Sequence, residues 1–414
     1  MRFVMCAALC LWFGTSALAD SQWSRFRGPN GCGTVDDVGK FPVAWTDADY
    51  AWRVELQGVG HSSPVAWDDL VVVTSGDAES GELIVDALDL ASGKSLWSRR
   101  LPGVDYPKHE ANSLASSTPA LDSQRIYVTR MTDQGVVLAA LSHQGVPLWE
   151  KLIGPYGERH GYGVSPIVVD DCIVLMHDSE AESFAICLDA ANGNQRWKAP
   201  RKSGTASFST PLVWRDSHGS QQIIAQSSAE GLAGLSFTDG SVQWNAPTAF
   251  PQRCVGSPIA DSQRVFAGNG AGSNGHSYVC VTPPTAKGEE AVVAYTLRRG
   301  MPQVPTALLH GERLLVWHDR GTASYVAVED GKTVWQQRLS GHFYGSPVSV
   351  GDVAYCISEE GVVVALALDD EFKELGQTDL GAASHATPAI HRGRMLLRTV
   401  STVMCLPEEP ATSP

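Results

Sequence analysis

The stretch ALDLASGKSLW, residues 87–97, decides the fold because its pattern returns along the chain. CLDAANGNQRW, residues 187–197, has the same order, and Trp149, Trp244 and Trp335 lie in similar strand-like segments. Each copy joins a small residue and an aliphatic residue to a polar turn and then to a segment that ends near tryptophan. A pattern that recurs at a steady period indicates a repeat architecture.

A second landmark is a Ser or Thr followed by Pro. It recurs every 41 to 55 residues, a spacing typical of propeller blades, and Val304-Pro305 is the one variant. The seven regular copies are Ser63-Pro64, Thr118-Pro119, Ser165-Pro166, Thr210-Pro211, Ser257-Pro258, Ser346-Pro347 and Thr387-Pro388. Together with the variant they mark eight units.

Each unit offers four short strands with turn residues between them. Proline fits at the first residue of a strand, because it lacks the N–H that a ladder position needs. The preceding hydroxyl can bond locally and fix the loop that enters the strand. The sequence therefore predicts an all-β fold, an eight-bladed β-propeller with four-stranded antiparallel blades, in which each Ser/Thr-Pro marks the innermost strand.

The eighth unit lacks its fourth strand, since the chain ends in PEEPATSP without a tryptophan segment. Residues 50–56, YAWRVEL, have the character of that missing strand. We expect this N-terminal strand to complete blade eight and close the ring, which removes free sheet edges. Units five and seven lack the tryptophan, and we expect irregular outer strands there.

The N-terminus has the features of a secretory signal peptide. Arg2 precedes a short apolar run that ends in Ala17-Leu18-Ala19, a small-x-small cleavage pattern. We predict residues 1–19 as signal peptide, 20–48 as a leader segment, 49–406 as the propeller and 407–414 as a flexible tail. The protein would then be periplasmic or secreted, and the alternative is an uncleaved anchor helix.

The charge and the cysteines restrict the function classes. Lys and Arg total 31 against 45 Asp and Glu, a net charge of −14, which argues against a nucleic-acid partner. After the signal peptide seven cysteines remain, with no adjacent pair and no C-x-x-C. We expect the cysteines at equivalent repeat positions, Cys187, Cys280 and Cys405, to be small buried residues, although one or two disulfides remain an alternative for an exported chain.

The repeat resembles the PQQ-type β-propeller family, over residues 50 to 406. WSRFRGPNG, residues 23–31, also resembles the leader of bacterial PQQ-binding-like propeller proteins. The resemblance implies eight blades, with tryptophans docked between neighbouring blades. It implies one of two functions: a periplasmic dehydrogenase that holds pyrroloquinoline quinone (PQQ) and calcium, or a cofactor-free scaffold such as the propeller lipoprotein of the β-barrel assembly machinery.

The dehydrogenases of this family carry an adjacent cysteine pair, a Glu/Asn/Asp calcium set and a catalytic Asp. This sequence has no Cys-Cys, and no stretch matches a calcium set. No catalytic residue can therefore be carried over, and we expect no cofactor, with PQQ and calcium as the alternative. The leader residues Trp23, Phe26 and Arg27 either fold over one end of the ring or pack on an outer blade.

Histidines gather in the connections between blades. Five of the twelve, including His109, lie where a tryptophan segment leads to the next Ser/Thr-Pro. These connections share one face of a propeller and converge on its channel, where imidazole, Arg and Tyr donors bind metals, anions or peptide ends. The alternative is a solvated polar rim. The candidate ligand face comprises His61, His160, Tyr162, Arg253, His342, Tyr344 and His385.

We hypothesise a non-catalytic, exported binding or scaffold protein, a monomer without a transmembrane segment that presents this face to a protein or peptide of the cell envelope. The first alternative is a PQQ-dependent dehydrogenase with atypical cofactor ligands. The second is a hydrolase or lyase that uses the histidine-rich face. The sequence identifies neither a partner nor a substrate.

Overall fold

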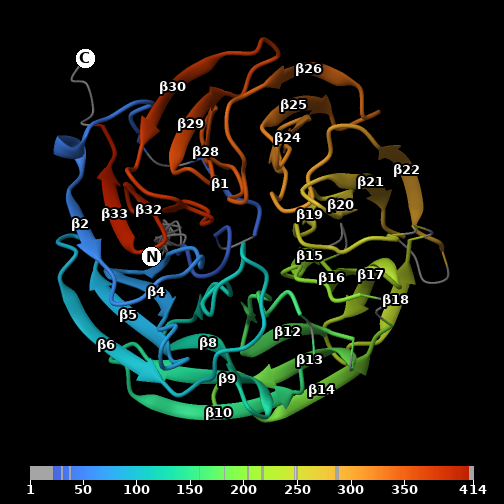
Figure 1. Cartoon of the computed structure of the whole chain (residues 1–414). Helices are drawn as coiled ribbons and strands as arrows, with labels where there is room; N and C mark the ends of the chain where they lie inside the picture. The colour runs from blue at the N-terminus through green and yellow to red at the C-terminus, as the bar shows by residue number, and fades with distance from the viewer. Residues whose placement is uncertain are drawn as a thin grey trace, which may run out of the picture.

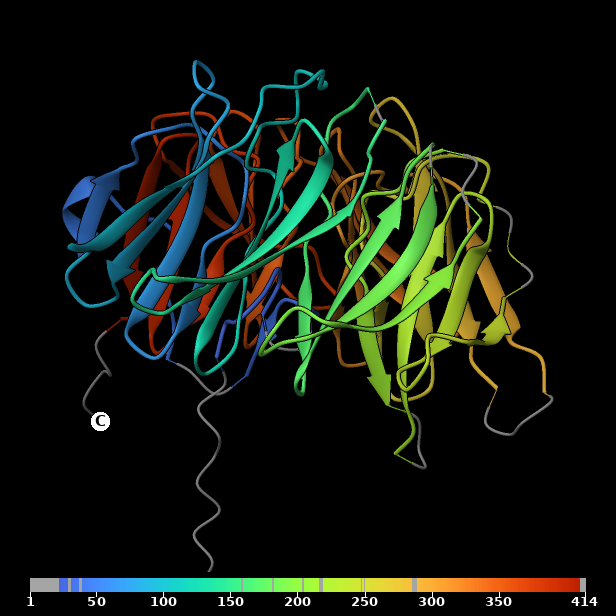
Figure 2. The same ribbon diagram turned by 90° about the horizontal axis from the view of Figure 1, so that it is seen from below.

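The computed structural model describes residues 22–28, 31–36, 39–157, 159–180, 182–202, 205–215, 219–246, 248, 250–284 and 289–409. Eight sheets surround a central axis, as Figure 1 shows face-on and Figure 2 edge-on. Within this part of the chain, no helix has the length and apolar character needed to cross a bilayer. The predicted signal peptide, residues 1–19, lies outside the described residues.

The first four blades follow one another along the chain. Blade one holds β3 (Val65–Trp67), β4 (Leu70–Gly76), β5 (Leu83–Asp89) and β6 (Ser95–Leu101). Blade two holds β7 (Ala120–Leu121), β8 (Arg125–Thr132), β9 (Gly135–Ser142) and β10 (Pro147–Gly154). Blade three holds β11 (Ile167–Val169), β12 (Cys172–Asp178), β13 (Ser183–Asp189) and β14 (Gln195–Pro200). Blade four holds β15 (Leu212–Arg215), β16 (Gln221–Ser227), β17 (Gly231–Ser236) and β18 (Val242–Asn245).

The second half repeats this order. Blade five holds β19 (Ile259–Ala260), β20 (Val265–Gly270), β21 (Gly275–Thr282) and β22 (Val292–Leu297). Blade six holds β23 (Leu308–His310), β24 (Arg313–Trp317), β25 (Thr322–Ala327) and β26 (Thr333–Arg338). Blade seven holds β27 (Val348–Val350), β28 (Val353–Ile357), β29 (Val362–Ala367) and β30 (Glu374–Asp379). Blade eight holds β31 (Ala389–His391), β32 (Arg394–Arg398) and β33 (Thr402–Pro407).

An N-terminal strand closes the ring, as the sequence predicted. The strand β2 (Trp52–Glu55) pairs antiparallel with β33, and Trp52 lies opposite Cys405. Figure 1 shows the blue β2 beside the red β33. The fold prediction of an eight-bladed propeller with four-stranded antiparallel blades is confirmed, because seven blades hold four consecutive strands in order from the channel outward and blade eight takes β2 as its fourth.

Five of the six outer-strand tryptophans donate their indole N–H to a carbonyl of the following blade, and the sixth, Trp244, donates to Gln222 in its own blade. The indole Nε1 of Trp97 in blade one donates to the carbonyl of His143 in blade two at 2.8 Å. A glycine in the same turn of blade two, Gly145, has φ +76° and faces the indole, and an added Cβ would lie 2.7 Å from the ring of Trp97. The same contact joins Trp149 to Gly193 in blade three. The repeated Gly thus makes room for the neighbour's tryptophan.

Units five and seven differ from what the sequence led us to expect. Their outer strands β22 and β30 are both present, and each pairs with a single register shift, as β6, β14, β18 and β26 do. In unit five Tyr295 takes the place of the tryptophan, since its hydroxyl donates to the carbonyl of Val328 in blade six at 2.9 Å. The irregular-strand prediction is therefore wrong for both units, and in unit five a different aromatic residue fulfils the docking role.

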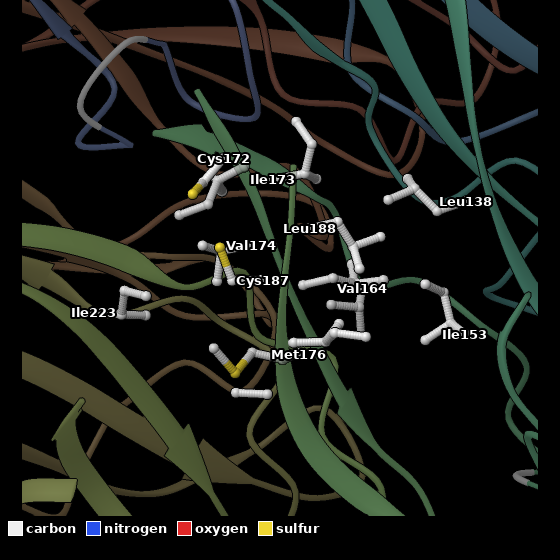
Figure 3. Packing of buried hydrophobic residues seen from close by; sticks show 14 of the residues in the cluster. Leu138, Ile153, Val164, Cys172, Ile173, Val174, Met176, Cys187, Leu188 and Ile223 are labelled. Carbon is white, nitrogen blue, oxygen red and sulfur yellow. The ribbon is translucent and has the colours of Figure 1, made fainter. Parts of the chain in front are cut away.

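Apolar side chains between the blades form the core. One cluster spans blades two to four and includes Leu138, Val164 and Ile223 (Figure 3). Cys187 and Cys280 are fully buried, as expected of small apolar residues, and none of the seven cysteines among the described residues forms a disulfide. Stacked sheets of this kind bury both faces of each inner strand, which explains why β4 has no exposed residue.

The leader enters the ring. Its short strand β1 (Thr34–Val35) pairs in parallel with β27, the innermost strand of blade seven, and makes that sheet five-stranded. A 3-10 turn, η1 (Asp47–Asp49), then leads to β2 at the outside. The chain end returns to the leader, where Glu408 accepts a hydrogen bond from the backbone N–H of Gly39 at 2.9 Å.

Candidate functional site

The Ser/Thr-Pro positions form a ring of hydroxyls around the channel. The backbone N–H of Ser63 in blade one donates to Oγ1 of Thr118 in blade two at 2.9 Å, and Thr118 donates likewise to Ser165. The pattern continues from Thr210 through blades five to eight and returns from Thr387 to Ser63 at 3.1 Å. We call these eight residues the hydroxyl ring: Ser63, Thr118, Ser165, Thr210, Ser257, Thr306, Ser346 and Thr387.

The hydroxyl ring differs from the local bond that the sequence suggested. Each accepting hydroxyl binds the neighbouring blade, not its own loop, so the motif ties adjacent blades together. In the variant unit, Thr306 supplies the hydroxyl one residue after Pro305, and it accepts the N–H of Ser257 at 2.9 Å. A hydroxyl at this position is thus present in all eight blades, while the proline can shift.

The leader closes the channel beneath this ring. Ala66 in blade one donates its N–H to the carbonyl of Trp23, and Leu121 in blade two donates to that of Ser24, both at 2.8 Å. Arg25 donates to the carbonyl of Pro211 in blade four at 3.0 Å. Innermost strands leave one edge unpaired, and the leader satisfies part of that edge.

Arg27 holds the leader to blades six and seven through hydrogen bonds. Its guanidinium donates to Pro347 of blade seven at 2.6 Å and to Ala307 of blade six at 2.9 Å, and also to the leader carbonyls of Gly31 and Cys32. Its side chain is fully buried, and this burial lowers the pKa of Arg27 to about 10, so the group stays protonated at neutral pH. The leader therefore closes one end of the ring, as one of the two sequence-based alternatives expected, and it does so by lying inside the channel.

A cavity of about 330 Å³ opens at the other side of the hydroxyl ring. We call it the mouth cavity. Phe26 of the leader forms part of its floor, and all eight hydroxyls of the ring line it. The connections between blades form its walls with imidazole, amide and guanidinium groups, and the described lining residues include no Asp or Glu. The cavity is therefore rich in hydrogen-bond donors.

Five of the seven candidate face residues line the mouth cavity: His61, His160, Arg253, Tyr344 and His385. His109 lines it as well. The other two candidates lie elsewhere. Tyr162 is buried in the core against Tyr156, with ring centroids 5.2 Å apart, and burial raises the pKa of its phenol. His342 is exposed on the rim outside the cavity.

Three candidates meet at the junction of blades seven, eight and one. The rings of His61 and His385 lie 4.1 Å apart between centroids, and Tyr344 lies 4.8 Å from His385. Burial lowers the pKa of His61 to about 3, and the nearby His385 and Arg398 lower it further. Burial also lowers the pKa of His385. Both imidazoles are therefore neutral at neutral pH.

A carboxylate stands just outside this junction. Glu359 lies 3.8 Å from Nε2 of His385 and 3.8 Å from Nδ1 of His342. Nδ1 of His385 lies 3.2 Å from the carbonyl of Ala111, which belongs to the connection before blade two. Nδ1 can donate its hydrogen to that carbonyl, which leaves Nε2 as an acceptor. The histidine thus joins loops from two distant parts of the chain.

Sequence reasoning missed the floor and one wall of the mouth cavity. Phe26 was expected either over one end of the ring or against an outer blade but not as part of a ligand cavity, and the ring hydroxyls were assigned a purely local role. Gln303 also lines the cavity, in a loop whose N–H groups bind the buried Asp319 at 2.7 and 3.1 Å. Burial raises the pKa of Asp319 to about 6. The recurrence of a hydroxyl in every unit was the one signal that could have identified the ring.

The mouth cavity does not fit calcium-bound PQQ. Calcium in proteins takes six to eight oxygen ligands, chiefly carboxylates, whereas the polar side chains among the described lining residues are hydroxyls, imidazoles, amides and one arginine, beside apolar groups such as Phe26 and Phe208. In the described part of the chain, no group of three or more His, Cys, Asp or Glu side chains is close enough together to hold a metal ion. The donors suit acceptor atoms on a ligand.

Comparisons with solved structures show the same fold at low identity. A europium-containing methanol dehydrogenase superposes with a TM-score of 0.71 at 12% identity, over 92% of this chain and 90% of the other. BamB from Moraxella catarrhalis superposes with a TM-score of 0.63 at 13% identity, over 86% of this chain and 96% of the other. The quinohemoprotein alcohol dehydrogenase from Comamonas testosteroni superposes with a TM-score of 0.65 at 12% identity, over 95% of this chain and 82% of the other.

Comparison with family models gives a more specific result. No curated protein matches the chain. A family model described as "Outer membrane protein assembly factor BamB" matches residues 81–299 and 291–405, well over half of the chain. This match agrees with the eightfold repeat, the docked tryptophans and the ring closure. The protein therefore belongs to the PQQ-like repeat β-propeller family that this model represents.

Proposed function

We propose that this protein is an exported, non-catalytic binding protein of the cell envelope that receives part of a protein partner in its mouth cavity. The observation that carries the proposal is the cavity itself. It is closed below by the leader, so a ligand enters from one face, and loops from around the ring supply its donors. Such a concave site with converging polar groups suits a protruding loop or chain end.

Two further observations support this assignment. The matching family model is described as an outer membrane protein assembly factor, which favours a protein partner at the envelope. The first 19 residues have the pattern of a secretory signal peptide, which favours export to the periplasm or beyond. The quinoprotein alternative has weaker support, since the lining residues lack the carboxylates that calcium requires.

The test is photo-crosslinking in the producing cell. A photoreactive residue replaces Tyr344 in the mouth cavity or, as a control, Leu148 on the outer strand β10, whose side chain is exposed. We expect a discrete crosslinked envelope protein from position 344 and none from position 148. The same discrete product from position 148 alone would contradict the proposal, because the partner would then bind the side of the ring.

A further inference from the structure

The hydroxyl ring holds hydrogens that the fold does not use. Seven of its eight oxygens accept a backbone N–H from the preceding blade. Within the described part of the chain, none of the eight hydroxyls donates to a protein acceptor, and each is more than nine-tenths buried. A hydroxyl has one hydrogen to donate besides its two lone pairs. The ring therefore offers up to eight O–H donors to whatever occupies the mouth cavity.

Two positive charges lie directly beneath these donors. Arg25 binds the carbonyl of Pro211, and Arg27 binds those of Pro347 and Ala307, each one residue beyond a ring position. Both guanidinium groups are buried, and among the described residues neither forms an ion pair with a carboxylate. The burial lowers the pKa of each arginine to about 10, which leaves both charged at neutral pH.

The wall of the cavity adds to this field. Arg253 lines the cavity above the ring, and no described lining residue carries a negative charge. A buried positive charge that is balanced only by carbonyl dipoles raises the electrostatic potential nearby, because the protein interior screens weakly. Converging neutral donors over fixed positive charge are the arrangement that binds anions most effectively.

We propose that the hydroxyl ring, with Arg25 and Arg27 beneath it, is an oxyanion-binding site at the floor of the mouth cavity. The ligand group is a carboxylate or a phosphate, whose several oxygens accept from neighbouring ring hydroxyls. The proposal rests on the proposed function and deepens it, since the partner segment would enter the cavity with an acidic group first. A free small acid carries the same carboxylate or phosphate group and is the other ligand that the experiment must distinguish from a partner segment.

The experiment is calorimetric titration of the purified protein with citrate and with inorganic phosphate. The test variant is Thr387→Val, which removes one ring hydroxyl at nearly constant volume, and Thr387→Ser restores it. The control is Thr378→Val: Thr378 is a buried threonine of β30 whose hydroxyl likewise accepts a backbone N–H, from Trp45 at 3.0 Å, far from the cavity. All variants are first compared with wild type by circular dichroism.

We expect saturable binding that weakens about tenfold in Thr387→Val and is unchanged in Thr387→Ser and Thr378→Val, since a hydrogen bond to a charged group is worth about that factor. Acetyl-triglycine with a free carboxylate and its C-terminal amide then distinguish the sources. Preference for the free carboxylate indicates a chain end, and binding of citrate or phosphate alone indicates a small acid.

The proposal is overturned if no oxyanion binds at about 1 mM, the weak end of ordinary affinities, or if folded Thr387→Val binds as wild type does. The crosslink at position 344 separates this failure from that of the proposed function. A crosslink that persists without oxyanion binding leaves the binding role intact and removes only the oxyanion site. Absence of both the crosslink and oxyanion binding rejects the proposed function together with the oxyanion site.

Discussion

Replacement of Arg27 by methionine should destabilise the propeller more than any surface change. The side chain makes hydrogen bonds to four carbonyl groups, from blades six and seven and from the leader. Methionine keeps the apolar stem but leaves these carbonyls without their donor. At about 1 kcal/mol for each orphaned acceptor, the loss is about 4 kcal/mol. Arg27→Lys should recover only part of it, since one ammonium cannot reach four acceptors.

The assay is urea unfolding followed by tryptophan fluorescence, with a thermal scan beside it. For a domain of this size, about 4 kcal/mol corresponds to a fall in Tm of about 5 °C. The control is Arg100→Met on β6, where an exposed arginine pairs with Asp77 and Glu82 and should contribute less than about 1 kcal/mol. Equal stability of the Arg27→Met and Arg100→Met variants would refute the idea that the leader fastens the ring.

Two further predictions concern pH and packing. His61→Gln should make the protein less sensitive to acid: the folded pKa of about 3 lies below the ordinary value of 6.5, so wild type loses stability as pH falls below 6.5, by about 2 kcal/mol at pH 5. Urea midpoints at pH 7 and pH 5 measure this, and an equal fall in wild type and variant would contradict it. Gly145→Ala should cost about 2 kcal/mol more than Gly311→Ala, because both have positive φ but only Gly145 faces an indole. Thermal unfolding compares the pair, and equal losses would contradict the docking role of Trp97.

The repeat made the fold predictable. Tryptophan, turn glycine and Ser/Thr-Pro recur because each blade solves the same packing problem against its neighbour, so one unit reveals all eight. The closing role of β2 followed from the missing fourth strand of the last unit. Tyr295 was missed because the docking contact needs an aromatic ring with a donor, and a tyrosine provides both outside the tryptophan pattern.

The site was less predictable, because it depends on contacts between residues far apart in sequence. Phe26 and Arg27 reach the channel because the leader folds into one end of the ring, and no periodicity reports that path. Tyr162 and His342 occupy the same kind of connection as His61, yet one turns into the core and the other into solvent. Position on a connecting loop fixes the face of the propeller but not the direction of a side chain.

The mouth cavity should bind its ligand without PQQ chemistry. The decisive experiment is titration of the purified protein with PQQ, with and without calcium, in which tryptophan quenching and dye-linked oxidation of alcohols are followed together. We expect no calcium-dependent saturation at micromolar PQQ and no oxidation. Binding of one equivalent that requires calcium, with alcohol-dependent dye reduction, would instead establish a dehydrogenase.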